Sequence, residues 1–236
     1  MNDVHLLKKE MGPQNKKAKK IMNNVQKKSD TTKKTKVFGE KRTRTKEKIL
    51  NTTITLIQEK GANGFTARDV AKHSDVAVGT VYTVFESFDD LVFSANSHTL
   101  DNLRNHIFAH LEAVTPSTPQ DTLLAIGEAY CDFAMINKEA WLGMFSYQPQ
   151  KPTPDWVLQS HLDMLNILVE PTKAIRPDKT DEEHLNLAKT LFLSVQGILQ
   201  YSLEERFVGL PTHLLQANIK MMISSVLASI TITNKA

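Results

Sequence analysis

The sequence predicts an all-α protein, and three observations lead to this prediction. Apolar residues recur at three- and four-residue spacing through most of the chain after residue 44, which is the period of one helix face. Several of these segments begin at a Ser or Thr that is followed three residues later by Asp or Glu, a signature of a helix N-terminus. No two alternating segments are joined by a hairpin turn. We expect about nine helices in total.

The composition is typical of a soluble globular protein, since 41% of the 236 residues are hydrophobic and 23% are charged. No apolar run approaches the ~20 residues of a membrane span, and the N-terminus lacks the apolar segment of a signal peptide. We therefore expect a cytoplasmic protein with no membrane partner. The single cysteine, Cys131, excludes an intramolecular disulfide and is expected to be a core residue.

Charge is distributed unevenly along the chain. Residues 1–46 contain 15 Lys/Arg and 4 Asp/Glu, a net charge of +11, whereas residues 47–236 contain 14 Lys/Arg and 22 Asp/Glu, a net charge of −8. A basic segment ahead of an acidic body indicates nucleic acid or another polyanion as partner. Residues 1–40 also have few large apolar side chains, which predicts a disordered, lysine-rich arm. The alternative is a tail that only increases solubility.

The first two helices follow this arm. Apolar residues at helical spacing predict a helix from Arg44, and Gly61 supplies its C-cap. The second helix begins at Thr66, because Asp69 completes a capping-box pattern, and it ends near Ser74.

The next segment, VAVGTVYTVFES between Val76 and Ser87, is rich in β-branched residues, as strands are. A lone strand exposes unpaired backbone groups, so we expect instead a short helix that packing holds in place. Val81 and Phe85 then share an inward face, and the outward residues are Val78, Thr80, Tyr82 and Thr83. A short helix with outer residues free for contact is typical of the second helix of a helix-turn-helix, which enters the major groove of DNA.

The stretch FTARDVAKHSDVAVGTVYTVFESFDDL resembles the DNA-binding signature of the tetracycline-repressor (TetR) family of bacterial transcription regulators. With the upstream KRTRTKEKIL, which is similar to the family's first helix, the resemblance covers about residues 41–91. NKEAWLGMFS and SVQGILQYSLEERF resemble a subgroup with a Trp/Val-His-Gly motif on its eighth helix, with Gln196 in place of His. The residues that match the DNA-binding signature are Phe65, Thr66, Val70, Ala71, Val76, Gly79, Thr80, Val81, Tyr82, Phe85, Ser87 and Leu91.

The resemblance implies a domain organisation and a function. A three-helix helix-turn-helix DNA-binding domain in residues 41–90 follows the arm of residues 1–40, and residues 91–236 form a larger helical effector-binding and dimerisation domain. The implied function is a sequence-specific, ligand-responsive repressor that binds a near-palindromic operator in double-stranded DNA. The last two long helices, from Thr180 and Pro211, are expected to pair with those of a second copy in a homodimer.

We expect the guanidinium of Arg68 to contact a guanine edge or a phosphate of DNA. The alternative is a salt bridge at the protein surface. Tyr82 is expected to donate to phosphate, the alternative being a partly buried core residue, and Thr66 is expected to cap its helix and contact phosphate. Phe88 stands where the family commonly has a phosphate-binding Lys, and we expect the arm to compensate for that charge. The candidate DNA-contacting residues are Arg44, Thr66, Arg68, Val78, Gly79, Thr80, Tyr82 and Thr83.

Helix-start signals recur in the larger domain, where Ser87 and Thr180 each have an acid three residues on and Thr118 and Thr153 each precede a proline. Pro171 is expected to end or kink one of these helices. The predicted spans are 87–111, 119–137, 138–146, 154–170, 180–207 and 211–230.

Aromatic, flexible or polar residues on these otherwise apolar helices are candidates to line a pocket for a small apolar effector, although each alone is better explained as core. They are Tyr130, Phe133, Met144, Phe145, Trp156, Phe192, Gln196 and Tyr201.

Two other classes of function are open. One is a non-specific architectural DNA-binding protein that relies on the arm; exposed Thr and Tyr on a helix-turn-helix favour sequence reading instead. The other is a small helical enzyme. The sequence has no HExxH pattern, no phosphate-binding glycine loop and no GxSxG elbow, so we expect no catalytic site, no metal site and no cofactor.

Overall fold

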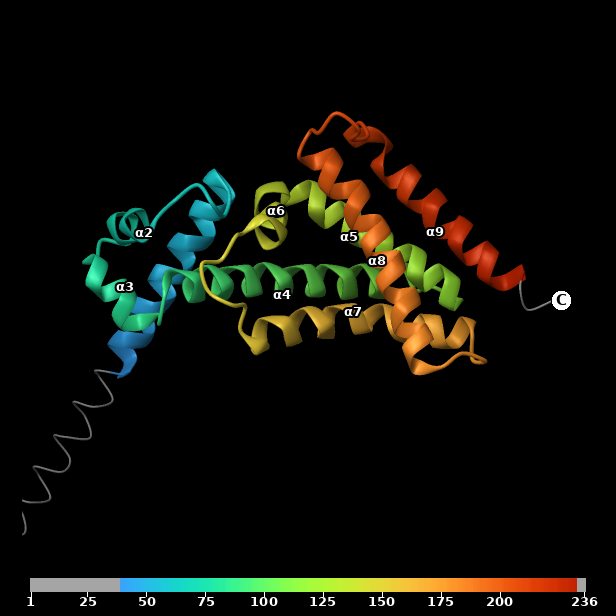
Figure 1. The fold of residues 1–236 in the computed structure, drawn as a ribbon, viewed down its shortest axis with the longest axis horizontal. Coiled ribbons are helices and arrows are strands. Elements are labelled where there is room, and N and C mark those ends of the chain that lie inside the picture. Colours follow the sequence, from blue (N-terminus) through green and yellow to red (C-terminus); the bar gives the residue numbers. More distant parts are fainter. Residues whose placement is uncertain (1–38, 233–236) are drawn as a thin grey trace, which may run out of the picture. The chain divides into compact units, whose positions relative to one another are not determined.

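The structure is a computed structural model that describes residues 39–232, so most of the predicted arm lies outside the described residues. The described residues form nine α-helices and one short 3-10 helix and contain no strand, which confirms the all-α prediction (Figure 1). Residues 39–60 form the first helix. The others are α2 (Ala67–His73), α3 (Val78–Val84), α4 (Phe88–Val114), α5 (Pro119–Ile136), α6 (Lys138–Ser146), α7 (Asp155–Ile175), α8 (Asp181–Leu203), η1 (Thr212–Leu214) and α9 (Leu215–Ile232).

The chain divides into two compact units, residues 1–48 and residues 49–236. The predicted domain boundary between residues 90 and 91 lies inside α4. None of the helices in residues 39–232 combines the length and the apolar character that crossing a membrane requires.

The predicted helix starts are confirmed at four positions. The side chains of Thr66, Ser87, Thr118 and Thr180 each accept a hydrogen bond from the backbone N–H three residues later, which satisfies a donor that the helix leaves free. At Gly61 the backbone has φ 71° and the N–H donates to Ile57 O at 2.9 Å, as a glycine C-cap requires.

The predicted end of α7 at residue 170 is wrong, because the helix continues through Pro171 to Ile175. Proline has no N–H to donate, so only one bond of the helix is lost, and the Thr172 hydroxyl donates to Val169 O at 2.7 Å beside it. The predicted start is also displaced, since Pro154 is itself the N-cap.

The ends of the last two long helices also differ from the prediction. Helix α8 ends at Leu203 instead of near residue 207, because Glu205 adopts φ 56° and the Arg206 N–H turns back to Tyr201 O. Pro211 precedes a 3-10 turn, and α9 begins only at Leu215.

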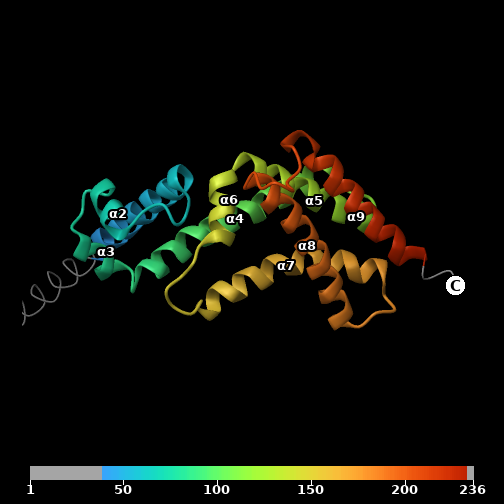
Figure 2. The ribbon, with the colours of Figure 1, turned by 45° about the horizontal axis from the view of Figure 1, so that its top comes forward.

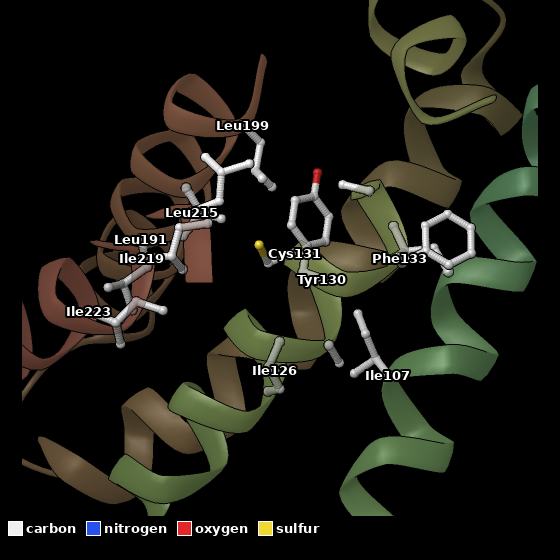
Figure 3. Packing of buried hydrophobic residues seen from close by; sticks show 14 of the residues in the cluster. Ile107, Ile126, Tyr130, Cys131, Phe133, Leu191, Leu199, Leu215, Ile219 and Ile223 are labelled. Atoms are coloured by element: carbon white, nitrogen blue, oxygen red, sulfur yellow. The ribbon is translucent and has the colours of Figure 1, made fainter. Parts of the chain in front are cut away.

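Two hydrophobic cores form within residues 49–236, and they share no buried residue. The smaller joins residues 49–57 to α2, α3 and the start of α4. The larger is built around α5, which packs against α4, α7 and α9, and α9 runs beside α5 in both views of the ribbon (Figures 1 and 2). Figure 3 shows Phe133 directed toward α4 and Cys131 toward the α9 side, so α5 is buried on more than one face.

Candidate DNA-binding and effector sites

The start of α2 is fixed by a reciprocal cap. The Thr66 N–H and hydroxyl donate to an Asp69 carboxylate oxygen at 2.8 and 2.7 Å, and the Asp69 N–H donates to the Thr66 hydroxyl oxygen at 3.4 Å. Hydrogen bonds from Thr66 also lower the pKa of Asp69. The cap predicted for Thr66 is confirmed, and its side chain remains exposed.

Helix α3 presents the two faces that the sequence predicts. Val81 and Phe85 are 0% and 2% exposed and belong to the smaller core, whereas Tyr82 is 51% exposed. The Tyr82 hydroxyl makes no hydrogen bond to any described residue, which favours a contact with DNA over the alternative of a partly buried core tyrosine. Thr83 is also exposed, and its hydroxyl donates to Gly79 O at 2.8 Å, which leaves its oxygen lone pairs free to accept.

The remaining candidate DNA contacts differ in how exposed they are. Arg68 is exposed and forms no ion pair within the described chain, so its predicted salt bridge is not present. A Cβ built on Gly79 meets nothing within 4 Å, Val78 is 37% exposed and Thr80 is half-buried. Arg44 is exposed in the unit of residues 1–48.

Phe88, which stands where a lysine was expected, has a packing role. Its ring meets Phe65 edge to face, with centroids 5.7 Å apart, at the border of the smaller core. The departure from the family's pattern therefore exchanges a phosphate contact for an aromatic contact between the start of α2 and the start of α4.

The segment between α6 and α7, residues 147–154, is bound to the smaller core; we call it the connector. The Asp89 carboxylate accepts the Tyr147 hydroxyl at 2.5 Å and the backbone N–H groups of Gln150 and Lys151 at 3.1 Å each. Burial and the contact with Asp89 raise the pKa of Tyr147, so the phenol stays protonated and donates. Asp89 is 7% exposed at the start of α4, directly after the helix-turn-helix.

Two further contacts tie the same region together. Asn63, in the loop before α2, donates to Ser146 O at 2.9 Å and accepts from the Gln148 N–H at 3.4 Å. A Cβ built on Gly143 of α6 would lie 3.0 Å from Ile57 and 3.3 Å from Ala62, so a larger residue would have to displace these side chains by a few tenths of an ångström. Helix α6 and the connector are thus attached to the helix-turn-helix by hydrogen bonds and by packing.

The larger domain contains an apolar cavity of about 560 Å³, within the range of small-molecule sites. Its walls come from α4, α5, α6, α7, α8 and α9. The lining residues of α4 and α5 are buried, whereas Leu158 and Leu162 of α7 and Leu193 of α8 are 52%, 46% and 63% exposed. The cavity therefore opens between α7 and α8.

The structure brings three of the eight predicted pocket residues to this cavity. Tyr130, Phe145 and Phe192 line it, with ring centroids 6.0 Å apart for Tyr130 and Phe192. Gln196 lies behind this wall, where its Oε1 accepts the Tyr130 hydroxyl at 2.6 Å.

The other four predicted pocket residues do not line the cavity. Phe133 packs on His106 and Met144 packs against the larger core, whereas Trp156 and Tyr201 are 42% and 46% exposed. Residue type alone cannot show which face of a helix meets a void. The sequence analysis did not identify the aliphatic residues of α4 and α7 that line the cavity, nor the two basic residues His161 and Lys189. A basic residue among Leu and Ile on an apolar helix face could have indicated these two.

Within residues 39–232 no three His, Cys, Asp or Glu side chains come together as metal ligands. Cys131 is buried, and burial raises its pKa to about 12, so the thiol is not ionised at neutral pH.

Comparison with known proteins agrees with this geometry. Residues 49–95 match the model of the family described as bacterial regulatory proteins, tetR family. No curated protein matches the chain in sequence.

Among solved structures, a TetR transcriptional regulator from Rhodococcus sp. RHA1 is 18% identical, with a TM-score of 0.55 over 78% of this chain and 96% of that one. A TetR-family transcriptional regulator from Streptomyces coelicolor is 15% identical, with a TM-score of 0.58 over 79% and 90%. A protein of unknown function from Rhodococcus sp. RHA1 is 15% identical, with a TM-score of 0.61 over 76% and 93%. Residues 49–95 thus resemble the tetR family of bacterial regulatory proteins, and the described chain has the same all-helical fold as these solved structures.

Proposed function

We propose that this DNA-binding protein is a cytoplasmic, ligand-responsive transcription repressor that acts as a homodimer on a near-palindromic operator. The outer face of α3 carries this proposal, because Tyr82, Thr83 and Gly79 are exposed there and the Tyr82 hydroxyl has no partner among the described residues. Two such helices enter successive major grooves about 34–36 Å apart on the operator. The assignment to the Trp/Val-His-Gly subgroup remains a prediction.

Exposed apolar side chains on the last two helices support the homodimer. Tyr201 of α8 is 46% exposed, and Met221 of α9 is 61% exposed. Pairing α8 and α9 with those of a second copy as a four-helix bundle removes these side chains from water.

Tyr82→Phe tests the DNA-binding face, because it removes the hydroxyl and keeps the ring. We expect affinity for an operator fragment, selected from genomic DNA by the unmodified protein, to fall by about 1–2 kcal/mol, the contribution of a hydrogen bond to a charged phosphate. Fluorescence anisotropy measures this loss, and sedimentation confirms that the oligomeric state is unchanged. Ser160→Ala is the control, since it removes a hydroxyl of α7 that lies outside the helix-turn-helix and donates to Trp156 O. Equal operator affinity of Tyr82→Phe and the unmodified protein removes Tyr82 from the interface.

The rival function, a non-specific architectural protein, is separated by the same fragments. A sequence-specific DNA-binding protein gives different footprints on selected genomic DNA and on random DNA. A protein that binds by charge alone gives the same footprint on both.

The connector provides a path by which a ligand in the cavity changes DNA binding. Phe145, the last aromatic residue of α6, lines the cavity two residues before Tyr147, and Leu158 lines it on the other side of the connector. A ligand that displaces these walls moves the connector, which Asp89 and Asn63 attach to the helix-turn-helix. Repression is then relieved because the ligand binds one arrangement of the two helix-turn-helix units better than the other.

Asp89→Asn is expected to weaken this coupling. Asparagine has nearly the same size but only one acceptor oxygen, so either the Tyr147 hydroxyl or both N–H groups of Gln150 and Lys151 lose their acceptor. We expect a small molecule that lowers operator affinity of the unmodified protein to bind Asp89→Asn normally and to release DNA about tenfold less effectively, within the usual range of coupling energies.

Calorimetry for the small molecule and anisotropy for the operator separate these two effects. Asp101→Asn is the control, because Asp101 also lies on α4 but pairs only with Arg104 at the surface. Undiminished release from Asp89→Asn excludes the connector as the path.

A further inference from the structure

We infer that the effector is a straight-chain aliphatic carboxylate, with its chain in the cavity between α7 and α8 and its head group beside Lys189. This inference rests on the proposed function only in treating the cavity as the effector site. Its first support is the chemistry of the wall. Of the residues that line the cavity, only Tyr130, His161 and Lys189 have a side chain with a nitrogen or oxygen atom; all others are aliphatic, aromatic, methionine or glycine.

Among the residues that line it, the deep end of the cavity offers no free hydrogen-bond donor. Tyr130 is 6% exposed there, and its hydroxyl proton is committed to Gln196 Oε1 at 2.6 Å. Burial raises the pKa of Tyr130, so the phenol carries no charge. A ligand group that needs hydrogen bonds loses those it made to water and gains none in return, which costs binding free energy. The buried part of the ligand is therefore hydrocarbon.

The cavity is long enough for an extended chain. Its lining on α7 runs from Leu158 to Leu168, and at a rise of about 1.5 Å per residue this is about 15 Å. The lining residues of α4 also follow the helix, from Leu100 to Ile107. The lining is mostly Leu and Ile, and its aromatic members, Tyr130, Phe145 and Phe192, lie together. This shape and lining suit an extended alkyl chain better than a flat ring system.

The mouth carries the charge. Lys189 and His161 are exposed, as are Leu158, Leu162 and Leu193 of the same two helices, so both basic residues lie where the cavity meets water. Lys189 forms no ion pair within residues 39–232. His161 Nδ1 is 2.9 Å from Val157 O. A carbonyl oxygen only accepts hydrogen bonds, so Nδ1 carries the hydrogen and Nε2 is the nitrogen left for a ligand. A cationic head group is repelled at this mouth, and a carboxylate pairs with the Lys189 ammonium.

The test uses the full-length protein and saturated carboxylates from about eight to about sixteen carbons, the range that a cavity of this size admits. Each is kept below its micelle concentration and displaces an apolar fluorescent dye from the cavity. Affinity is expected to rise about fourfold for each added methylene group until the chain fills the cavity. At one length the carboxylate is expected to bind about threefold to tenfold more tightly than the alcohol, and the trimethylammonium compound most weakly.

Substitutions of the exposed Lys189 test the head group without disturbing the core. Lys189→Gln is expected to remove the preference for carboxylate over alcohol, and Lys189→Glu to reverse it in favour of the ammonium compound. Lys179→Gln, in the loop before α8 and paired with Glu183, is the control and keeps the preference. The inference is overturned if affinity does not depend on chain length, or if the preference for carboxylate survives in Lys189→Glu.

Operator affinity measured with the same compounds distinguishes this inference from the proposed function. Carboxylates that bind with the expected dependence on chain length but leave operator affinity unchanged support the ligand class and contradict a ligand-responsive repressor. Release of the operator by a compound that binds without dependence on chain length or on Lys189 supports the repressor and overturns the ligand class.

Discussion

Deletion of residues 1–36 is expected to lower the affinity for operator and for random DNA together. It is also expected to reduce the slope of log affinity against log salt concentration by several units. These residues contain 11 lysines, whereas the segment from Thr66 to Leu91 contains two basic residues, Arg68 and Lys72, and five acids. The described surface adds a reason, because α3 carries no basic residue and Phe88 occupies the position of the expected lysine. Phosphate neutralisation must therefore come from elsewhere.

Each phosphate that a lysine neutralises adds about −0.9 to the slope of log affinity against log salt. Base preference is expected to survive the deletion, since α3 still reads the bases. The measurement is a salt titration of anisotropy on operator and random duplexes. A full-length variant with the 11 lysines replaced by glutamine is the matched control for chain length and should behave like the deletion. If either variant keeps both affinity and slope, the arm only increases solubility.

Local signals predicted most of the fold. A capping residue and its acid lie within four positions of each other, and their hydrogen bonds satisfy the same helix end wherever the helix sits, which is why the starts at Thr66, Ser87 and Thr180 were predictable. The start after Thr118 followed from Pro119, because proline fits the first turn of a helix. The inward face of α3 followed from the spacing of Val81 and Phe85, although the composition of that segment favours a strand. The prediction that Pro171 ends its helix failed, because the loss of one hydrogen bond near the end of a packed helix does not end that helix.

Contacts between distant parts of the chain could not be predicted in this way. In the sequence, Asp89 is one of several acids at the start of a helix. Only the fold shows that its carboxylate accepts hydrogen bonds from residues 58 to 62 positions later in the chain. The cavity depends on which faces of six helices fail to meet, so Leu158 and Lys189 line it while Trp156, on the same helix as Leu158, does not. Among the proposed DNA contacts, exposure of Tyr82 is settled by the fold, and the contact itself remains a prediction.

The second large effect is expected for Phe85→Ala, which should unfold the helix-turn-helix and leave the larger domain folded. Phe85 is 2% exposed at the C-cap of α3 and is among the largest side chains of the smaller core. Truncation of a buried Phe costs about 3–5 kcal/mol, which is comparable to the whole stability of many small domains. The larger core shares no buried residue with this one, so its own packing is preserved.

Hydrogen exchange measured by mass spectrometry distinguishes the two domains. In Phe85→Ala we expect residues 49–95 to exchange much faster, residues 100–230 to exchange as before, and the cavity to keep its affinity for an apolar dye while operator binding is lost. Val78→Ala is the control on the same helix; Val78 is 37% exposed, and alanine favours the helix, so exchange should hardly change. Faster exchange throughout residues 49–230 in Phe85→Ala would show instead that Asp89, Asn63 and the close contact at Gly143 join the two cores into one cooperative unit. Unchanged exchange in residues 49–95 would contradict the role of Phe85 in holding α3, since no other side chain of that helix except Val81 is buried.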